Sequence, residues 1–563
     1  MAEGASLRRR VVRAGPASAL LDGAFLRRVR VGGREVLRGV YAAVRDQSWG
    51  TVEPTFSRYD LQAGEDAFRL RFTAEHRRGE IDFVWDGEYV GEPSGRIVFR
   101  LDGLCRTTFR KNRIGFCLLH PPELAGTPYV RETPAGPIEE RFPELISPRR
   151  DVPEMRALRY ECGPVGVELR FAGDLFDMED QRNWTDASYK TFCTPLSRPY
   201  PVQVQAGQRI AQTVTLELRV PAGLDRPAPH GGPDAIVSDR SVGRLPPIGL
   251  ACSSDGRPLG ARAIERLREL RPAHLRVELD PRAAVWRDVL GAATADAVAL
   301  GTPLDVAIVT DEAGAGVEQI ASALAPSPVP VLRFATFADE AGVTTRPLLA
   351  RARAAGPPGR IGGGSRSHFA QVNMQAAAVP LSELEFVAYG VDPQAHAFDD
   401  LSVMETLSVQ GATVESARAL AGERPIVVGP ITLRAGEADP RQTTSFAAAW
   451  TVGSLHRLGA AGASGLTYFE TVGPSGVLDT SGAPYPAYDV LAAAAPWSGA
   501  DVLEVALSDP FATEALALRS DHSQLVLVAN LTAEQRRVVV ALPSGGSRAV
   551  DLGPYAVIRI DPG

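Results

Sequence analysis

The chain is poor in several kinds of residue, and each shortage excludes a class of protein. Only five of its 563 residues are cysteines, an odd number with no C-x-x-C pair, which argues against a disulfide framework or a zinc site. No apolar run approaches the roughly 20 residues that a membrane-spanning helix needs. The net charge is only −7, with Lys and Arg spread along the chain, which argues against nucleic acid as a partner. We therefore expect a cytoplasmic protein with reduced thiols that binds neither membranes nor nucleic acid.

The spacing of strand-like segments changes along the chain and predicts three domains. From about residue 17 to residue 221, short strands are separated by turn residues, and residues 210–219 alternate apolar and polar side chains. Because no long helical period interrupts them, an N-terminal β-sandwich is predicted over residues 1–235. Residues 221–247 are rich in Pro and Gly and have the composition of a linker. Strands return after residue 497 and predict a small antiparallel β-sandwich domain over residues 497–563.

Strands and helices alternate regularly in the central part of the chain. Strands are expected at 248–252, 274–279, 304–309, 329–334, 360–367, 384–389, 426–433 and 465–469, with a long Ala-rich helix at 444–458 before the last strand. This alternation predicts parallel pairing through right-handed crossovers, and eight such units favour a closed (β/α)8 TIM barrel over residues 245–490. An open doubly wound sheet would instead need a G-x-G-x-x-G turn after its first strand, where the chain reads Ser253-Ser254-Asp255-Gly256.

The candidate catalytic carboxylate is Glu470. Functional groups of such barrels lie at the carboxyl ends of the strands, and Glu470 ends the eighth strand between an aromatic pair and a glycine-containing loop. This position suits general acid–base catalysis, and the alternative is an ion pair to Arg276 that closes the barrel. By the same rule, the substrate is expected to contact Arg276, Glu278, His368 and Tyr468.

A histidine, an amide and a second arginine complete the predicted catalytic group. His396 lies in a long loop after the sixth strand, close in sequence to three carboxylates, Asp392, Asp399 and Asp400. A histidine oriented by a carboxylate is a competent proton shuttle, and the alternative is a hydrogen-bonded loop residue. Asn373 suits a hydrogen bond to substrate or to an oxyanion. Arg434 suits a carboxylate or a carbonyl group, unless it forms an ion pair at the rim.

One dense polar segment, residues 176–190, lies within the predicted sandwich. Low strand propensity in its first half predicts a loop, and its carboxylates, planar polar groups and aromatic rings suit the binding of a polyol. The substrate contacts expected there are Asp177, Glu179, Arg182, Asn183, Trp184 and Lys190. The alternative is a solvated loop held by its own ion pairs. The carboxylate spacing matches no EF-hand loop, so no metal ion is predicted, and this segment is expected to share a pocket with the barrel.

Four segments carry a resemblance to a known family. They are residues 176–196, which end S-Y-K-T-F-C-T-P-L, residues 392–399, D-P-Q-A-H-A-F-D, residues 429–434, G-P-I-T-L-R, and residues 467–471, T-Y-F-E-T. Together they resemble the D-apionate lactonases of bacterial D-apiose catabolism, and the resemblance extends over most of the chain. It implies that a small sugar lactone with a five-membered ring is hydrolysed to the open aldonate, with no organic cofactor.

The chemistry of lactone hydrolysis leads to a hypothesis for the roles of individual residues, and the sequence departs from the family pattern at one point. Glu470 or His396 would activate water. Asn373 and Arg434 would polarise the carbonyl, and residues 177–190 would hold the sugar hydroxyls. Where the family pattern is expected to read F-x-E-L-N-R, the chain reads F-A-Q-V-N-M from residue 369. The neutral Gln371 cannot act as a general base, so a catalytic role of this position would predict altered or lost lactonase activity.

Two alternative functions fit the same residues. A barrel flanked by β-sandwiches is common among retaining glycoside hydrolases, which need two carboxylates about 5–5.5 Å apart. Glu470 and Glu278 are the pair that the sequence offers for this chemistry. The other alternative is a non-catalytic carbohydrate-binding protein with a degenerate barrel, a reading that Gln371 favours.

Overall fold

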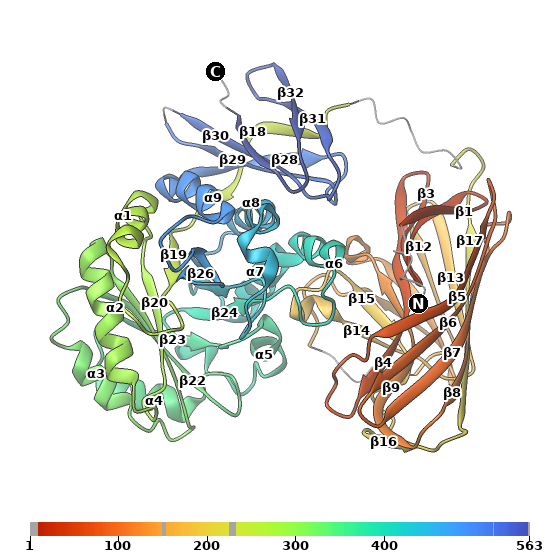
Figure 1. Cartoon of the computed structure of the whole chain (residues 1–563), viewed down its shortest axis with the longest axis horizontal. Coiled ribbons are helices and arrows are strands. Elements are labelled where there is room, and N and C mark those ends of the chain that lie inside the picture. The colour runs from red at the N-terminus through yellow and green to blue at the C-terminus, as the bar shows by residue number, and fades with distance from the viewer. Residues whose placement is uncertain (1–8, 149–153, 225–231, 522, 561–563) are drawn as a thin grey trace. The chain divides into compact units, whose positions relative to one another are not determined.

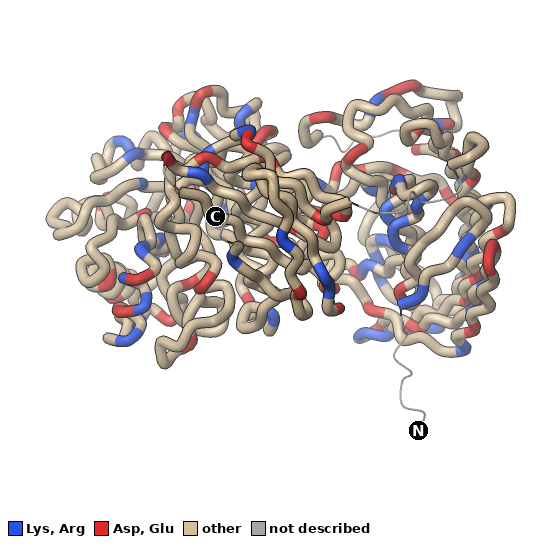
Figure 2. Tube along the Cα trace, turned by 90° about the horizontal axis from the view of Figure 1, so that it is seen from above, with Lys and Arg blue, Asp and Glu red and all other residues tan. Residues whose placement is uncertain are grey.

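The computed structural model describes residues 9–148, 154–224, 232–521 and 523–560 (Figure 1). The chain divides into two compact units. The first comprises Met1–Gln181 and Ser188–Pro229, and the second comprises Arg182–Ala187 and His230–Gly563. Six residues in the middle of the first unit's sequence therefore belong to the second unit. Figure 2 shows acidic and basic residues interspersed over both units, as a small net charge leads one to expect.

The first unit consists of two antiparallel sheets and confirms the predicted β-sandwich. One sheet has the order β1-β2-β3-β4-β9-β15-β14, with β16 beside β9. Its strands are β1 (Arg10–Ala14), β2 (Ala17–Asp22), β3 (Phe25–Val31), β4 (Arg34–Asp46), β9 (Phe109–His120), β14 (Asp177–Asp180), β15 (Tyr189–Phe192) and β16 (Val202–Val204). The other sheet has the order β11-β10-β12-β13-β17-β8-β7-β6-β5. Its strands are β5 (Pro54–Ala63), β6 (Phe68–Arg78), β7 (Ile81–Gly91), β8 (Ile97–Cys105), β10 (Pro128–Thr133), β11 (Gly136–Arg141), β12 (Ala157–Cys162), β13 (Val165–Ala172) and β17 (Arg209–Arg219).

Aromatic side chains from both sheets form the core of the sandwich. Burial alternates strictly along β7, so that every second side chain of the strand faces inward. Two of these buried residues, Trp85 and Tyr89, contact Phe116 of β9 in the opposite sheet. The alternating stretch at residues 210–219 lies on β17, which belongs to the same core.

The polar segment at residues 176–190 is not the loop that its composition predicts. It forms β14, a 3-10 turn η2 (Gln181–Trp184) and the start of β15. β14 pairs with β15, and β15 pairs in turn with β9, so the backbone groups of the segment enter an existing sheet. This pairing and the burial of Met178 outweigh the low strand propensity, which is a weak determinant for strands inside a sheet.

The second unit contains the predicted barrel of eight parallel strands. The strands pair in the order of the sequence, and β19 pairs with β26 to close the barrel. They are β19 (Ile248–Ala251), β20 (Leu275–Leu279), β21 (Leu304–Thr310), β22 (Val331–Ala338), β23 (Arg360–Gly364), β24 (Val387–Val391), β25 (Ile426–Ile431) and β26 (Gly465–Val472), with β27 (Gly476–Leu478) beside β26. The helices of this unit are α1 (Ala261–Leu270), α2 (Trp286–Leu300), α3 (Val317–Leu324), α4 (Arg346–Ala355), α5 (Phe369–Met374), α6 (Asp400–Glu405), α7 (Leu407–Ala421), α8 (Ser445–Ala460) and α9 (Pro486–Ala494).

Helix α8 joins the barrel to a C-terminal sheet. It is buried along nearly its whole length and contacts α7, α9 and β29 (Thr513–Arg519), as Figure 1 shows. A helix that is covered on all sides needs small apolar residues rather than one apolar stripe, which explains its high Ala content. In the described ranges, no helix is long and apolar enough to cross a membrane.

The C-terminal sheet includes a strand that the sequence analysis assigned to a linker. Its order is β32-β31-β18-β28-β29-β30-β33. Besides β29, its strands are β18 (Ala235–Arg244), β28 (Asp501–Leu507), β30 (Gln524–Asn530), β31 (Arg536–Ala541), β32 (Ser547–Leu552) and β33 (Val557–Ile560). The linker prediction for 221–247 was wrong for β18, which lies between β31 and β28. Only Ala235 and Val237 of β18 are buried, and its register shifts twice, so its alternation is too short to recognise. Residues 225–231 of the predicted linker lie outside the described residues.

Candidate active site

A cavity of about 650 Å³ lies at the carboxyl ends of the barrel strands. Its polar lining includes four residues that the sequence analysis nominated, Arg276, Glu278, His368 and Glu470. It also includes side chains that the analysis gave no role of their own in the site, Cys252, Ser254, Arg366, Asp392 and Thr432. All of them follow or end a barrel strand, so the rule that located Glu470 applies to them as well.

Glu470 is held at the cavity by an irregularity in β26. The pairing with β19 shifts by one residue at this point, and Phe469 has a positive φ of 29°. A non-glycine residue in this region is strained, and such irregularities re-aim side chains next to functional sites. As a result Phe469 and Glu470, although consecutive, both line the cavity.

The carboxyl group of Glu470 is bonded to the loop after β19. Its Oε2 accepts hydrogen bonds from the backbone N of Ser254 at 3.0 Å and from the Ser254 Oγ at 3.2 Å. Burial raises the pKa of Glu470, and the two bonds from Ser254 oppose that rise only in part. The ion pair to Arg276 that was weighed from the sequence is not formed among the described residues, because Arg276 lies against Asp305 instead. A half-buried carboxyl group with a raised pKa is suited to accept and return a proton.

Glu278, on the neighbouring wall, is paired with a cation. Its Oε1 accepts two hydrogen bonds from Arg366, from Nε at 3.0 Å and from Nη2 at 2.6 Å. Two bonds from one guanidinium to a carboxylate make a charge-assisted ion pair of defined geometry. Glu278 and Glu470 therefore differ, because Glu278 is paired with a cation and Glu470 accepts its bonds from Ser254.

His368 lines the cavity close to Asp392. Burial lowers the pKa of His368, while the carboxylates of Asp392 and Asp186 oppose this effect and His396 adds to it. Its Nδ1 is buried and has no hydrogen-bond partner in the part of the chain that is described. Asp392 accepts bonds from the backbone N of Gln394 at 2.8 Å and of Ala435 at 3.0 Å, which ties together the loops after β24 and β25.

His396 has a carboxylate partner, but it is not one of its sequence neighbours. Its Nδ1 lies 2.6 Å from the Oδ2 of Asp186, and the Trp184 ring packs edge-on against its ring at a centroid distance of 5.2 Å. Both partners belong to Arg182–Ala187, the short segment that joins the second unit. The prediction that Asp392, Asp399 or Asp400 orients His396 was wrong, and Asp186 was not foreseen in this role.

The 182–187 segment has two further bonds to the barrel loops. The Thr185 Oγ1 donates to the backbone O of Asp392 at 3.2 Å. The Nδ2 of Asn373, which lies on α5, donates to the Oδ1 of Asn183 at 2.9 Å. Asn373 and His396 therefore hold this segment, and neither of them lines the cavity. Arg182 is buried within the same segment.

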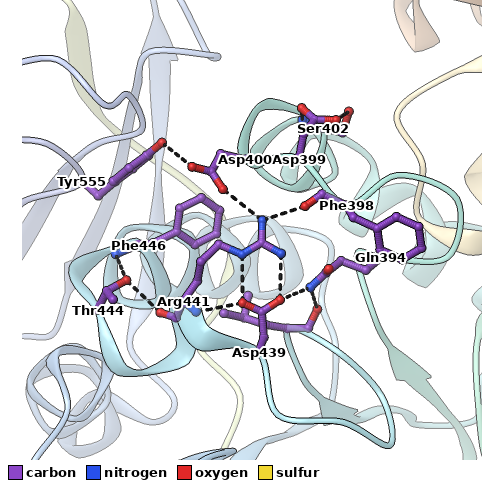
Figure 3. A network of polar contacts seen from close by, with 11 residues as sticks. Gln394, Phe398, Asp399, Asp400, Ser402, Asp439, Arg441, Thr444, Phe446 and Tyr555 are labelled. Atoms are coloured by element: carbon purple, nitrogen blue, oxygen red, sulfur yellow. Dashed lines mark hydrogen bonds and ion pairs between the residues drawn. The ribbon is translucent and has the colours of Figure 1, made fainter. Parts of the chain in front are cut away.

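The acidic residues after His396 serve the local structure (Figure 3). Asp399 caps α6 by accepting a bond from the backbone N of Ser402 at 3.1 Å. Asp400 accepts a bond from the Nη1 of Arg441 at 3.0 Å and another from the hydroxyl of Tyr555 at 3.2 Å. Arg441 is also held by Asp439 through two bonds of 2.8 and 2.7 Å. These contacts fix the loop between β24 and α6 without involving His396.

Two more nominated residues of the barrel, besides Asn373 and His396, lie outside the cavity. Arg434 forms an ion pair with Glu437 at 2.7 Å and lies over the Phe398 ring, which is the rim ion pair weighed as the alternative. Tyr468 is fully buried, and its hydroxyl donates to the Oγ of Ser454 on α8 at 2.8 Å. Tyr468 therefore points away from the cavity and is corrected to a core residue.

Three further nominated residues belong to the first unit. Asp177 accepts bonds from the backbone N of Met178 and of Leu196, and burial raises its pKa to about 6. Glu179 and Lys190 form an ion pair at 3.2 Å across β14 and β15. Each of these side chains thus has a partner within its own hairpin.

Gln371 does not line the cavity. It lies on α5, and its Oε1 is buried without a hydrogen-bond partner among the residues described. The departure from the expected family pattern therefore takes no general base out of the cavity. Nor do the described side chains include a group of three or more His, Cys, Asp or Glu placed to hold a metal ion.

Sequence comparison finds matches in the N-terminal, central and C-terminal parts of the chain. Models of the D-apionate lactonase family match its N-terminal domain at residues 2–221, its TIM barrel domain at 248–437 and 434–499, and its C-terminal immunoglobulin-like domain at 510–560. A curated D-apionate lactonase of Brucella anthropi is 30% identical over 97% of this chain and 96% of its own length.

The solved structures that match the chain are more distant in sequence. A GH30 endoxylanase from Clostridium papyrosolvens is 12% identical with a TM-score of 0.41, over 57% of this chain and 98% of that one. A GH39 enzyme from Xanthomonas axonopodis pv. citri is 11% identical with a TM-score of 0.39, over 61% of this chain and 96% of that one. The family models match all three domains, and the curated relative is matched over nearly its whole length, so this chain belongs to the D-apionate lactonase family.

Proposed function

We propose that the protein is a sugar lactonase that opens a five-membered lactone resembling D-apionolactone to its aldonate. The observation that carries the proposal is Glu470, a half-buried carboxyl group with a raised pKa, in the cavity of the barrel domain that matches the family. A cavity of about 650 Å³ is ample for one small sugar ring. The full-length similarity to a curated D-apionate lactonase supports the substrate class.

Lactone hydrolysis needs a base, a stabilised oxyanion and a proton for the leaving oxygen. In the proposed reaction, Glu470 takes a proton from water while the water oxygen bonds to the carbonyl carbon. The bond between that carbon and the ring oxygen then breaks, and Glu470 returns the proton to the ring oxygen. Glu470 is preferred to His396 because only Glu470 lines the cavity. His396 instead positions the 182–187 segment through Asp186.

The proposed function is tested with a panel of aldonolactones, including D-apionolactone, assayed by proton release with and without a chelator. Five-membered lactones should release protons at equal rates in both conditions, because each ester opened gives an ionised acid. Nitrophenyl glycosides, assayed in parallel, should release no nitrophenol. Nitrophenol release without lactone hydrolysis would instead support the glycoside hydrolase. Sugar binding without any turnover would support the non-catalytic carbohydrate-binding protein.

The acid limb of the pH profile should respond to Ser254. Hydrolysis needs ionised Glu470, so kcat/KM falls as the pH falls through the pKa of Glu470, which burial has raised. Ser254→Ala removes the Oγ bond that favours the charged form, and should move the acid limb upward by about one pH unit. Ser327→Ala, in the loop after α3, is the control and should keep the wild-type profile. An acid limb unmoved by Ser254→Ala would mean that it reports another group.

We also propose that the protein acts in the cytoplasm. All five cysteines are free thiols, and four of them are buried. Unpaired cysteines are typical of reducing compartments. Cys252 lines the cavity, but burial raises the pKa of its thiol to about 12, so we propose no nucleophilic role for it.

A further inference from the structure

The interior of the barrel beneath the cavity is charged. Arg276 on β20, Asp305 on β21 and Arg333 on β22 are paired in register across the three neighbouring strands. All three are at least nine-tenths buried, and Arg276 also lines the cavity. Arg276 precedes Glu278 by two residues on β20 and is only 4% exposed, so it lies deeper in the barrel than the more exposed Glu278. Arg276, Asp305, Arg333 and the adjacent His274 are called the floor of the cavity below.

The carboxylate of this floor is already neutralised by Arg333. The Oδ2 of Asp305 accepts bonds from Arg333 Nε at 3.1 Å and from Arg333 Nη2 at 2.8 Å. Arg276 approaches the same oxygen only to 3.8 Å, which is too far for a hydrogen bond. Its Nη2 is buried and has no hydrogen-bond partner within the described ranges. Two guanidinium groups therefore face one carboxylate.

Among the described residues, His274 is the other titratable group in contact with this cluster, and it does not cancel the excess positive charge. His274 lies beside Arg333, with its Nε2 3.2 Å from the Nη2 of Arg333 and 2.8 Å from the Oγ1 of Thr467. Burial and the adjacent Arg333 lower the pKa of His274 to about 3, so the ring is neutral at working pH. On the cavity wall, Glu278 is paired with Arg366, Asp392 accepts bonds from two backbone N atoms, and Glu470 accepts bonds from Ser254. The floor thus presents one uncompensated positive charge to the cavity.

We infer that Arg276 is the anion-binding residue of the cavity, which takes the carbonyl oxygen of the substrate as it becomes an oxyanion and then a carboxylate oxygen of the aldonate product. A buried, unpartnered guanidinium nitrogen is costly to leave unpaired, and an anion of the substrate would pair it. The identification of that anion with the lactone oxygen rests on the proposed lactonase function. When water adds to the carbonyl carbon, the electron pair of the C=O bond moves to this oxygen next to Arg276. When the ring C–O bond breaks, the electron pair on this oxygen re-forms the C=O bond, and the bonding pair leaves with the ring oxygen, which receives the proton from Glu470. The new carboxylic acid then releases its remaining proton to solvent, and the carboxylate that results lies next to Arg276.

The inference predicts a binding preference that does not require turnover. Wild-type protein should bind D-apionate about tenfold or more tightly than the matched neutral polyol, because a hydrogen bond to a charged group is among the stronger ones. Arg276→Gln should abolish this preference while leaving the binding of the polyol unchanged. Isothermal titration calorimetry measures both ligands on both proteins. Arg351→Gln, on the exposed face of α4, is the matched control and should keep the wild-type preference.

A conservative variant and a rate measurement complete the test. Arg276→Lys keeps the charge but loses the planar fork, so its aldonate affinity should be about tenfold lower than that of the wild type. This variant replaces Arg276→Gln in the test if Arg276→Gln does not fold. Arg276→Gln should also lower kcat by about 10²–10³-fold, the loss typical of one oxyanion donor. The inference would be overturned if Arg276→Gln bound the aldonate as tightly as the wild type, even if lactones are hydrolysed. If Arg276→Gln is unfolded, unchanged aldonate affinity in Arg276→Lys has the same consequence. Aldonate binding that depends on Arg276, without hydrolysis of any lactone, would support the anion site and refute the proposed function.

Discussion

Glu470→Gln is expected to lower kcat/KM for lactone hydrolysis by about 10²–10⁴-fold, the contribution typical of a positioned general acid–base group. The amide has the shape of the carboxyl group, and its oxygen can still accept both bonds from Ser254. Packing around the cavity should therefore be kept while the basic oxygen is lost. Initial rates of proton release from D-apionolactone measure the effect.

The control for this prediction is the same chemical change elsewhere in the barrel. Glu318 lies on α3 and forms an exposed ion pair with Arg351, so Glu318→Gln should retain the wild-type rate. Circular dichroism of both variants should match that of the wild type. A Glu470→Gln protein that is folded and hydrolyses the lactone at nearly the wild-type rate would remove Glu470 from the mechanism.

The barrel could be predicted because its signal is local. Each strand and helix shows its own periodicity within about ten residues, and alternation of the two dictates parallel pairing. The strand β18 could not be recognised in this way. It pairs with β28 and β31, which follow it by more than 250 residues, and it buries only Ala235 and Val237. Such a strand is stabilised mainly by pairing with strands that are distant in sequence, so its own short segment of sequence carries no clear strand signal.

The location of the site could be predicted from the sequence, but only some of its side chains could. The direction of the parallel strands dictates which end of the barrel carries functional groups, and this located Glu470, Arg276 and His368. Strict alternation would turn Tyr468 and Glu470 to the same side of β26. The irregularity at Phe469 breaks that alternation, so Tyr468 enters the core and Glu470 the cavity.

Contacts between residues that are distant in sequence explain why the partners of His396 and Asn373 were not predicted. His396 and Asp186 are 210 residues apart, and Asn373 and Asn183 are 190 residues apart. Neither pair has a local motif that would reveal it. The sequence offered His396 three nearby carboxylates, of which Asp399 and Asp400 are occupied by a helix cap and by Arg441.

Glu514→Ala is expected to lower the stability of the protein strongly, because Glu514 belongs to a buried charge cluster between α8 and β29. Glu514 is 1% exposed and accepts bonds from His456 Nδ1 at 2.9 Å and from Arg457 Nε and Nη2 at 3.1 and 2.9 Å. Glu514→Ala would leave these cationic and polar groups without their acceptor. Removing one partner of a buried ion pair costs about 3–5 kcal/mol, so the free energy of unfolding should fall by that amount. Urea denaturation at pH 7, followed by circular dichroism, measures it.

The pH dependence separates this charge effect from lost packing. Burial alone would raise the pKa of Glu514, but Arg457 and His456 outweigh it and lower the pKa to about 2. A carboxyl group with a lowered pKa stabilises the fold above its unfolded pKa of about 4.3, and this contribution is lost as the pH falls toward 2. The difference between wild type and Glu514→Gln should therefore shrink over this range. Glu504→Ala, on the neighbouring β28, removes exposed contacts with Arg240 and Ser238 and should change the free energy of unfolding little. Equal, small losses in Glu514→Ala and Glu504→Ala would show that the buried cluster does not stabilise the junction of barrel and sheet.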